Sequence, residues 1–121
     1  MAKRVFDLED RLIDFVLLVD QIIESMSNTR LANHLANQMV RSSTSPALNY
    51  GEAQSAESTR DFVHKLKVIL KELRETRVCL KFILKKELAD STRINEALDE
   101  NNQLIAIFLK SIDTASKNSN K

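Results

Sequence analysis

The sequence predicts an all-α protein, an antiparallel up-down-up-down four-helix bundle, and three observations support this prediction. The 121 residues include one glycine and one proline, so the turn residues that join strands tightly are almost absent. Good helix formers such as Leu, Ala, Glu, Lys and Arg dominate the composition. Apolar residues recur at helical spacing along four segments. A chain of this length fits a single domain, residues 1–121.

The boundaries of the four helices follow from their apolar stripes and from residues that favour helix starts. The predicted helices cover residues 5–26, 29–56, 59–88 and 92–115, and the polar tail, 116–121, is expected to fray. Short polar side chains precede each of the last three helices, which suits N-caps. The expected caps are Ser27 or Asn28, then Ser58 with Asp61 three residues later, then Asp90 or Ser91. The stripe expected to face the core on the last helix consists of Ile94, Leu98, Ile105, Phe108 and Ile112.

The stretch RSSTSPALNYGEAQSAESTRDF contains Pro46 and Gly51, which favour a loop at residues 42–52. Its spacing nevertheless keeps one helical face, so we expect the helix to continue. A proline inside a helix costs about 3 kcal/mol and bends it, so the prediction is a proline-kinked second helix. The face expected to point inward is Leu31, Leu35, Met39, Ser42, Pro46, Asn49, Ala53 and Ala56.

A second group of apolar residues lies away from the core stripes. On the first helix it contains Phe6, Ile13 and Leu17; on the third it contains Val78 and Phe82. Single exposed apolar residues are normal, but aligned ones on two outward faces suggest a surface that a partner covers. The sequence therefore favours self-association through these faces, with an apolar monomer surface as the alternative.

The third helix also has a basic stripe. Residues 61–88 carry eight basic against four acidic side chains. Such a stripe is usually a solvated face or a source of ion pairs between subunits, and the alternative is contact with RNA or DNA phosphates. Phe82 is the one aromatic residue near it, which disfavours base stacking. The stripe consists of Arg60, Lys67, Lys71, Arg74, Lys81 and Lys85.

Several polar residues fall on or beside the inward faces of the second and third helices. Buried polar groups need partners, so we expect Asn49 to pair with Glu75 or Thr76, and Glu52 with Lys65. Such a network would fix helix register; the alternative is an active site. The full set is Asn49, Glu52, Lys65, Glu72, Glu75 and Thr76.

Catalytic and cofactor sites are not evident from the residue pattern. A di-metal bundle needs paired Glu-x-x-His motifs, and the nearest approximation is Asp61 with His64, while His34 has Leu31 three residues before it. Cys79 has neither a His nor a second Cys near it and suits packing. We therefore expect no enzyme activity, no cofactor, no metal and no small-molecule substrate.

Charge and cysteine usage point to a cytoplasmic protein without a membrane segment. The 18 basic and 17 acidic residues give a net charge of +1, which argues against strong whole-surface attraction to nucleic acid or membranes. A single cysteine fits a reducing compartment. Charges interrupt the N-terminal apolar residues, and no apolar run reaches the roughly 18 residues of a membrane span.

The stretch at residues 42–83 contains Thr44-Ser45, Asn49 and Glu52-Ala53, followed by Asp61-Phe62, Lys71-Glu72 and Glu75-Thr76. With these residues it resembles the signature of the four helix bundle protein family, whose founding members are encoded in intervening sequences of bacterial large-subunit ribosomal RNA genes. The resemblance implies an antiparallel bundle whose second helix includes the Ser-Pro-Ala-Leu-Asn segment, and a closed homo-oligomer, with a pentamer favoured. The accessory protein of diversity-generating retroelements is similar and binds nucleic acid through a basic surface, whereas this chain is nearly neutral. The resembling residues are Thr44, Ser45, Asn49, Glu52, Ala53, Ala56, Ser58, Asp61, Phe62, Lys65, Leu66, Lys71, Glu72, Glu75 and Thr76.

Two functions remain. The first is a non-enzymatic homo-oligomeric scaffold or interaction module, with Phe6, Ile13, Leu17, Val78 and Phe82 at the subunit contacts. The second is an accessory protein that binds RNA or DNA through the basic stripe of the third helix.

Overall fold

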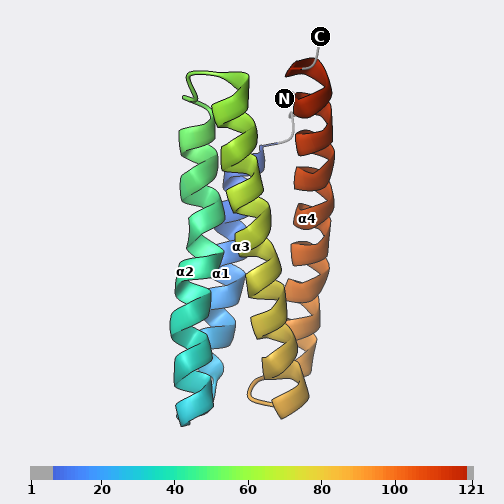
Figure 1. The fold of residues 1–121 in the computed structure, drawn as a ribbon. Helices are drawn as coiled ribbons and strands as arrows, with labels where there is room; N and C mark the ends of the chain where they lie inside the picture. The colour runs from blue at the N-terminus through green and yellow to red at the C-terminus, as the bar shows by residue number, and fades with distance from the viewer. Residues whose placement is uncertain (1–6, 120–121) are drawn as a thin grey trace, which may run out of the picture.

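The computed structural model describes residues 7–119 and consists of four α-helices joined by short connections. Successive helices run in opposite directions, so the bundle is antiparallel (Figure 1). No strand occurs in this described part of the chain, which confirms the predicted all-α four-helix class. The helices are α1 (Leu8–Ser25), α2 (Arg30–Ala53), α3 (Thr59–Lys86) and α4 (Ser91–Ser119).

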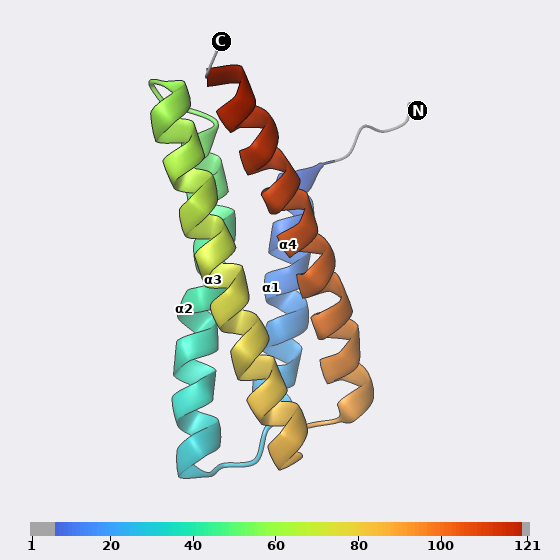
Figure 2. The ribbon, with the colours of Figure 1, turned by 45° about the vertical axis from the view of Figure 1, so that its right-hand side comes forward.

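The four helices occupy the corners of a bundle in which α1 and α3 are diagonal to each other. Helix α1 contacts α2 and α4, and α3 contacts the same two helices, with no close backbone contact between α1 and α3 among the described residues. The most extensive packing joins α2 to α3 and α3 to α4. The outer faces of α1 and α3 therefore point to opposite sides of the molecule (Figure 2).

Side-chain oxygens cap three of the helices. Asp7, Thr29 and Ser58 accept hydrogen bonds from the backbone N–H three residues ahead, at 3.2, 3.1 and 3.0 Å. The cap of α3 is the predicted one, whereas Ser27 or Asn28 was the wrong prediction for α2. The chain stays extended through Thr29, so its hydroxyl faces the first free N–H groups of the helix.

Helix α2 continues through Pro46 and Gly51, so the alternative of a loop at residues 42–52 is wrong. A side chain at Gly51 would meet open space, so this glycine imposes no local constraint. A bend at Pro46 stays a prediction. The helix ends at Ala53, earlier than the predicted residue 56.

The other boundaries differ from the predictions by a few residues. Helix α3 ends at Lys86 because Glu87 adopts a left-handed conformation with φ 56°, and its N–H returns to the carbonyls of the last turn. Helix α4 extends through Ser119, past the predicted end at residue 115. Residues 5 and 6 of the first predicted helix and the end of the tail lie outside the described residues.

One apolar core runs along the bundle axis. Phe15 and Phe108 are fully buried, and the Tyr50 ring meets Phe108 edge-on with centroids 6.0 Å apart. Helix α2 contributes small buried residues, Ser42 and Ser43 among them, where other helices contribute Leu and Ile. Leu31, predicted to face inward, is 37% exposed.

Candidate functional site

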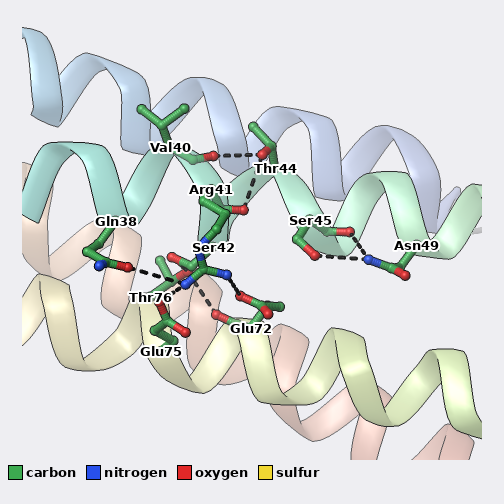
Figure 3. Close-up of polar contacts among 10 residues, drawn as sticks. All are labelled: Gln38, Val40, Arg41, Ser42, Thr44, Ser45, Asn49, Glu72, Glu75 and Thr76. Atoms are coloured by element: carbon green, nitrogen blue, oxygen red, sulfur yellow. Dashed lines mark hydrogen bonds and ion pairs between the residues drawn. The ribbon is translucent and has the colours of Figure 1, made fainter.

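The most polar cluster of the bundle lies between α2 and α3 and centres on Arg41 (Figure 3). Arg41 Nη1 lies 2.7 Å from Glu72 Oε1, and Nη2 pairs with Glu75 Oε2. The same Nη2 donates to Gln38 Oε1 at 3.3 Å. The Glu72 side chain is only 9% exposed, so its carboxylate is buried against this partner. The hydrogen bond to Glu72 raises the pKa of Arg41, which keeps the guanidinium charged.

Beneath this ion-pair cluster, two buried hydroxyls join the helices. Ser42 Oγ and Thr76 Oγ1 lie 2.7 Å apart, and both residues have no exposed surface. Thr76 also donates to the Glu72 backbone carbonyl at 3.0 Å. One hydroxyl can therefore donate inside its own helix while the other donates across, so both are satisfied without water.

Of the two predicted polar pairs, the structure contains one. Lys65 Nζ lies 2.7 Å from Glu52 Oε1, where α2 and α3 approach the connection between them. The predicted contact of Asn49 with Glu75 or Thr76 is wrong. Asn49 Nδ2 instead donates to the Ser45 carbonyl at 3.0 Å and to Ser45 Oγ at 2.9 Å, because both groups lie one turn back on its own helix.

Arg41 is a residue that the sequence prediction missed. It lies on the outer side of α2 with its side chain 53% exposed, so its stripe position gave no sign of a packing role. A long arginine side chain can nonetheless lie along its own helix and reach a neighbour. The sequence signal for it was the presence of two carboxylates, Glu72 and Glu75, on the side of α3 that faces α2. Two such carboxylates need a cation from the neighbouring helix.

A second missed contact joins α1 to α4. Arg11 Nε and Nη2 donate to the two oxygens of Glu100 at 2.7 and 2.9 Å, and Nη2 also reaches Gln103 Oε1 at 2.8 Å. Both charged side chains are about a quarter exposed, at 27% and 25%. This two-point geometry orients the helices more firmly than a single contact would.

A buried amide in the core of α4 has no partner. Asn101 is fully buried, and its Oδ1 and Nδ2 make no hydrogen bond with any described residue. The prediction missed it, although Asn101 lies seven residues from both Ile94 and Phe108 and so falls on the same stripe.

The cluster around Arg41 offers little for catalysis. The Ser42 hydroxyl pairs with another hydroxyl, not with a basic group that could activate it. Burial raises the pKa of the Cys79 thiol, which disfavours the reactive thiolate. No group of three metal-ligating side chains occurs within residues 7–119. The geometry is that of a contact that joins two helices.

The outward apolar residues form two pairs, which we name the α1 pair, Ile13 and Leu17, and the α3 pair, Val78 and Phe82. They are 42%, 56%, 52% and 52% exposed, respectively. Phe6, predicted to extend the α1 pair, lies outside the described residues. Val40, Leu48 and Leu109 are also exposed, at positions the prediction did not name.

Shallow grooves lie beside α3. One, of about 490 Å³, runs between α2 and α3, with Leu31, Leu35 and the α3 pair in its wall. Another, of about 500 Å³, lies between α3 and the end of α4, with Arg60, His64 and Lys67 in its wall. The first groove is apolar and continues the α3 pair across to α2.

All six residues of the predicted basic stripe are exposed on α3. None of them forms an ion pair or hydrogen bond with another residue of the described chain. Two of the acids of α3, Glu72 and Glu75, pair with Arg41 of α2 instead.

Comparison with known proteins identifies the family. A sequence model described as the 23S rRNA-intervening sequence protein matches residues 7–110. The chain belongs to this family. A crystal structure of a protein with unknown function from the S23 ribosomal protein family of Bacteroides thetaiotaomicron is 23% identical, with a TM-score of 0.76. The match covers 88% of this chain and 98% of that one, and it supports the fold. No match was found among curated proteins.

Membership of the 23S rRNA-intervening sequence protein family agrees with the resemblance of residues 42–83. The matched range includes the Arg41 cluster, both apolar pairs and the basic stripe. The described helices of this family member include none with the length and apolar character of a membrane span.

The hydroxyl pair can be tested by a double-mutant cycle. Thr76→Val removes one partner and leaves the Ser42 hydroxyl buried alone, so the free energy of unfolding should fall by about 1–3 kcal/mol. Adding Ser42→Ala should recover part of that loss, because no unpaired hydroxyl remains. Urea unfolding followed by circular dichroism measures both changes. Strictly additive losses would show that the two hydroxyls do not interact.

The unpaired amide predicts a stabilising substitution. Asn101→Leu should raise the free energy of unfolding by about 1–3 kcal/mol, because it removes a buried polar group that lacks a partner. The matched control is Asn102→Leu at the exposed neighbouring position, with an expected change within about 0.5 kcal/mol. Thermal unfolding of the three proteins compares them. Destabilisation by Asn101→Leu alone would show that the amide has a bonded partner in solution.

Proposed function

We propose that this chain is a non-enzymatic, cytoplasmic, homo-oligomeric scaffold or interaction module. The observation that carries the proposal is the presence of two exposed apolar pairs on diagonal helices. In a monomer both pairs stay exposed to water, whereas an assembly buries them. The partner is another copy of the chain, and no cofactor or small-molecule substrate takes part.

The apolar pairs alone supply a limited driving force. Completing the burial of four half-exposed large side chains contributes on the order of 3–6 kcal/mol. Association costs an estimated 4–15 kcal/mol in lost translational and rotational freedom. The groove beside the α3 pair adds apolar area from Leu31 and Leu35. A stable assembly therefore needs further contacts around the two pairs.

The expected assembly is a closed ring of five copies, because the resemblance to the family implies a pentamer. A contact between two different faces repeats from subunit to subunit, and it gives a closed ring where the rotation between neighbouring copies closes and an open filament where it does not. The cluster around Arg41 would then hold the two helices of each subunit in register, and it would have no chemical role.

The second candidate function is nucleic-acid binding through the basic stripe of α3. The specific observation is that all six cations are exposed and unpaired within the described chain. Unpaired surface cations can contact phosphates, and repetition around an oligomer would multiply the effect. The groove with Arg60, His64 and Lys67 in its wall adds a concave basic surface near the start of α3.

Disruption of either apolar pair tests the scaffold. Phe82→Asp and Leu17→Asp should each lower the mass of the assembly while helicity by circular dichroism stays unchanged, because a charge enters an apolar contact. The control is Leu48→Asp, since Leu48 is 67% exposed on α2 and belongs to neither pair. Sedimentation velocity measures the mass. Assemblies that persist in both variants would exclude these two pairs as the subunit contact.

The nucleic-acid function predicts binding that weakens steeply with salt. The triple variant Lys67→Gln, Lys71→Gln and Arg74→Gln should bind RNA more weakly. The slope of log affinity against log salt concentration should also become shallower, by the equivalent of about three phosphate contacts. Fluorescence anisotropy with a mixed-sequence RNA measures both. Lys110→Gln on α4 is the control. An unchanged affinity in the triple variant would remove the stripe as the binding surface.

A further inference from the structure

We propose that the assembly is head-to-tail, with the acidic outer face of α1 in one copy docked on the basic outer face of α3 in the next. This inference rests on the proposed self-association and names the two surfaces that meet. Four observations carry it: the charges of α1, the charges of α3, the mixture of charges elsewhere, and the diagonal placement of the two helices.

The outer face of α1 is uniformly acidic. Every exposed charged side chain along Leu8–Ser25, all of which the structure describes, is a carboxylate. Arg11, the one cation of this helix, is engaged by Glu100 across the α1–α4 contact. The hydrogen bond and the nearby charge of Asp7 raise the pKa of Asp10, as expected where carboxylates crowd together. The exposed acids are Glu9, Asp10, Asp14, Asp20 and Glu24.

The outer face of α3 has the opposite sign. All of the charged side chains that α3 exposes fully along Thr59–Lys86 are cations. Its carboxylates are buried or partly covered, and Glu72 and Glu75 are paired with Arg41. The exposed cations are the six stripe residues together with Arg77 and Lys86.

This separation of charge is confined to α1 and α3. Helix α2 exposes Arg30 and Arg41 but also Glu52, and α4 exposes both signs along its length. The net charge of the whole chain is +1, so its acids and bases nearly balance overall. A near-neutral chain that places its acids on one helix and its bases on the diagonal helix has two complementary surfaces.

Each charged face surrounds an apolar pair of the same spacing. Ile13 and Leu17 are four residues apart on α1, and Val78 and Phe82 are four residues apart on α3, so each pair lies on one face. Asp20 and Glu24 follow the α1 pair toward the end of its helix, whereas Lys81 lies between Val78 and Phe82 in the sequence and Lys85 follows Phe82. Both helices end at the same end of the bundle (Figure 2). Parallel docking therefore brings acids opposite bases around an apolar centre.

Charge also selects against the symmetric alternatives. An α1–α1 contact would oppose carboxylates, and an α3–α3 contact would oppose cations, which costs affinity. The favourable pairing joins two different faces, so each copy offers one free face to the next. Such a contact repeats and gives a ring where the rotation closes. The basic stripe of α3 is then covered by the next copy and is not free for phosphate contact.

Charge reversal on each face tests this arrangement. Asp20→Lys with Glu24→Lys reverses the two charges beside the α1 pair, and the change at residue 24 adds a cation to the last turn of the helix, which favours its folding. Lys81→Glu with Lys85→Glu reverses the two charges beside the α3 pair. Each double variant opposes like charges, so the concentration at which half the chains assemble should rise at least tenfold. The quadruple variant restores opposite charges and should assemble again within threefold of the native chain.

The controls are Glu57→Lys and Lys110→Glu, which reverse exposed charges outside both faces and should leave the assembly unchanged. Sedimentation velocity over a concentration series at low salt measures all the variants. Assembly that survives both double variants, or a quadruple variant that stays dissociated, would overturn the head-to-tail contact. A double variant on α3 that dissociates while the α1 variant does not would also overturn it, in favour of an α3 contact with a different surface.

A native chain that is monomeric throughout the series would overturn the proposed scaffold itself, and with it this contact. A native oligomer whose α1 and α3 variants behave like the controls would leave the scaffold standing and overturn the contact alone.

Discussion

The unbroken course of helix α2 through Pro46 is the constraint on which the rest of the structure depends. A break there would remove the surface against which α3 packs, and α3 contacts α2 more extensively than it contacts any other described helix. A proline inside a helix costs about 3 kcal/mol, so tertiary contacts must compensate. Those contacts are the Ser42–Thr76 hydroxyl pair and, above it, the ion pairs of Arg41 with Glu72 and Glu75. Small residues on α2 allow the two helices to meet at these points.

The periodicity of apolar residues was sufficient to predict four helices and the continuation of α2, because helical spacing persists through Pro46. The cap of α3 was predicted from Ser58 with Asp61 three residues later. Helix ends were less predictable, since a left-handed residue such as Glu87 has no distinctive sequence signal. The Lys65–Glu52 pair was predicted because both residues fall near the flanks of their helices, where polar groups need partners. Arg41 was missed because it lies on the outer side of α2, and its long side chain reaches across to Glu72 and Glu75 of α3. The predicted partner of Asn49 was wrong because its side chain bonds to Ser45 of its own helix. Asn101 lay on the apolar stripe and could have been found there.

The arrangement of helices determines which surfaces can serve assembly. Because α1 and α3 are diagonal, the two faces predicted as apolar point away from each other and cannot cover one another within one chain. Of the two charged faces, the sequence analysis predicted only the basic one. The basic stripe was noted, but the acidic face of α1 emerged when burial and the Arg11–Glu100 pair removed its one cation from the exposed set. The polar cluster joins α2 to α3, and the outer faces of α1 and α3 remain exposed. Both features fit the proposed assembly.

The most direct test of the account is the absolute mass of the unmodified chain by light scattering at moderate salt, with and without mixed RNA. The account predicts a mass that is a multiple of the 13.8 kDa chain, near five copies, and unchanged by RNA. A mass of 13.8 kDa under all conditions would contradict it, because both apolar pairs would then remain exposed. A mass that rises only with RNA would contradict it as well, and would favour nucleic-acid binding.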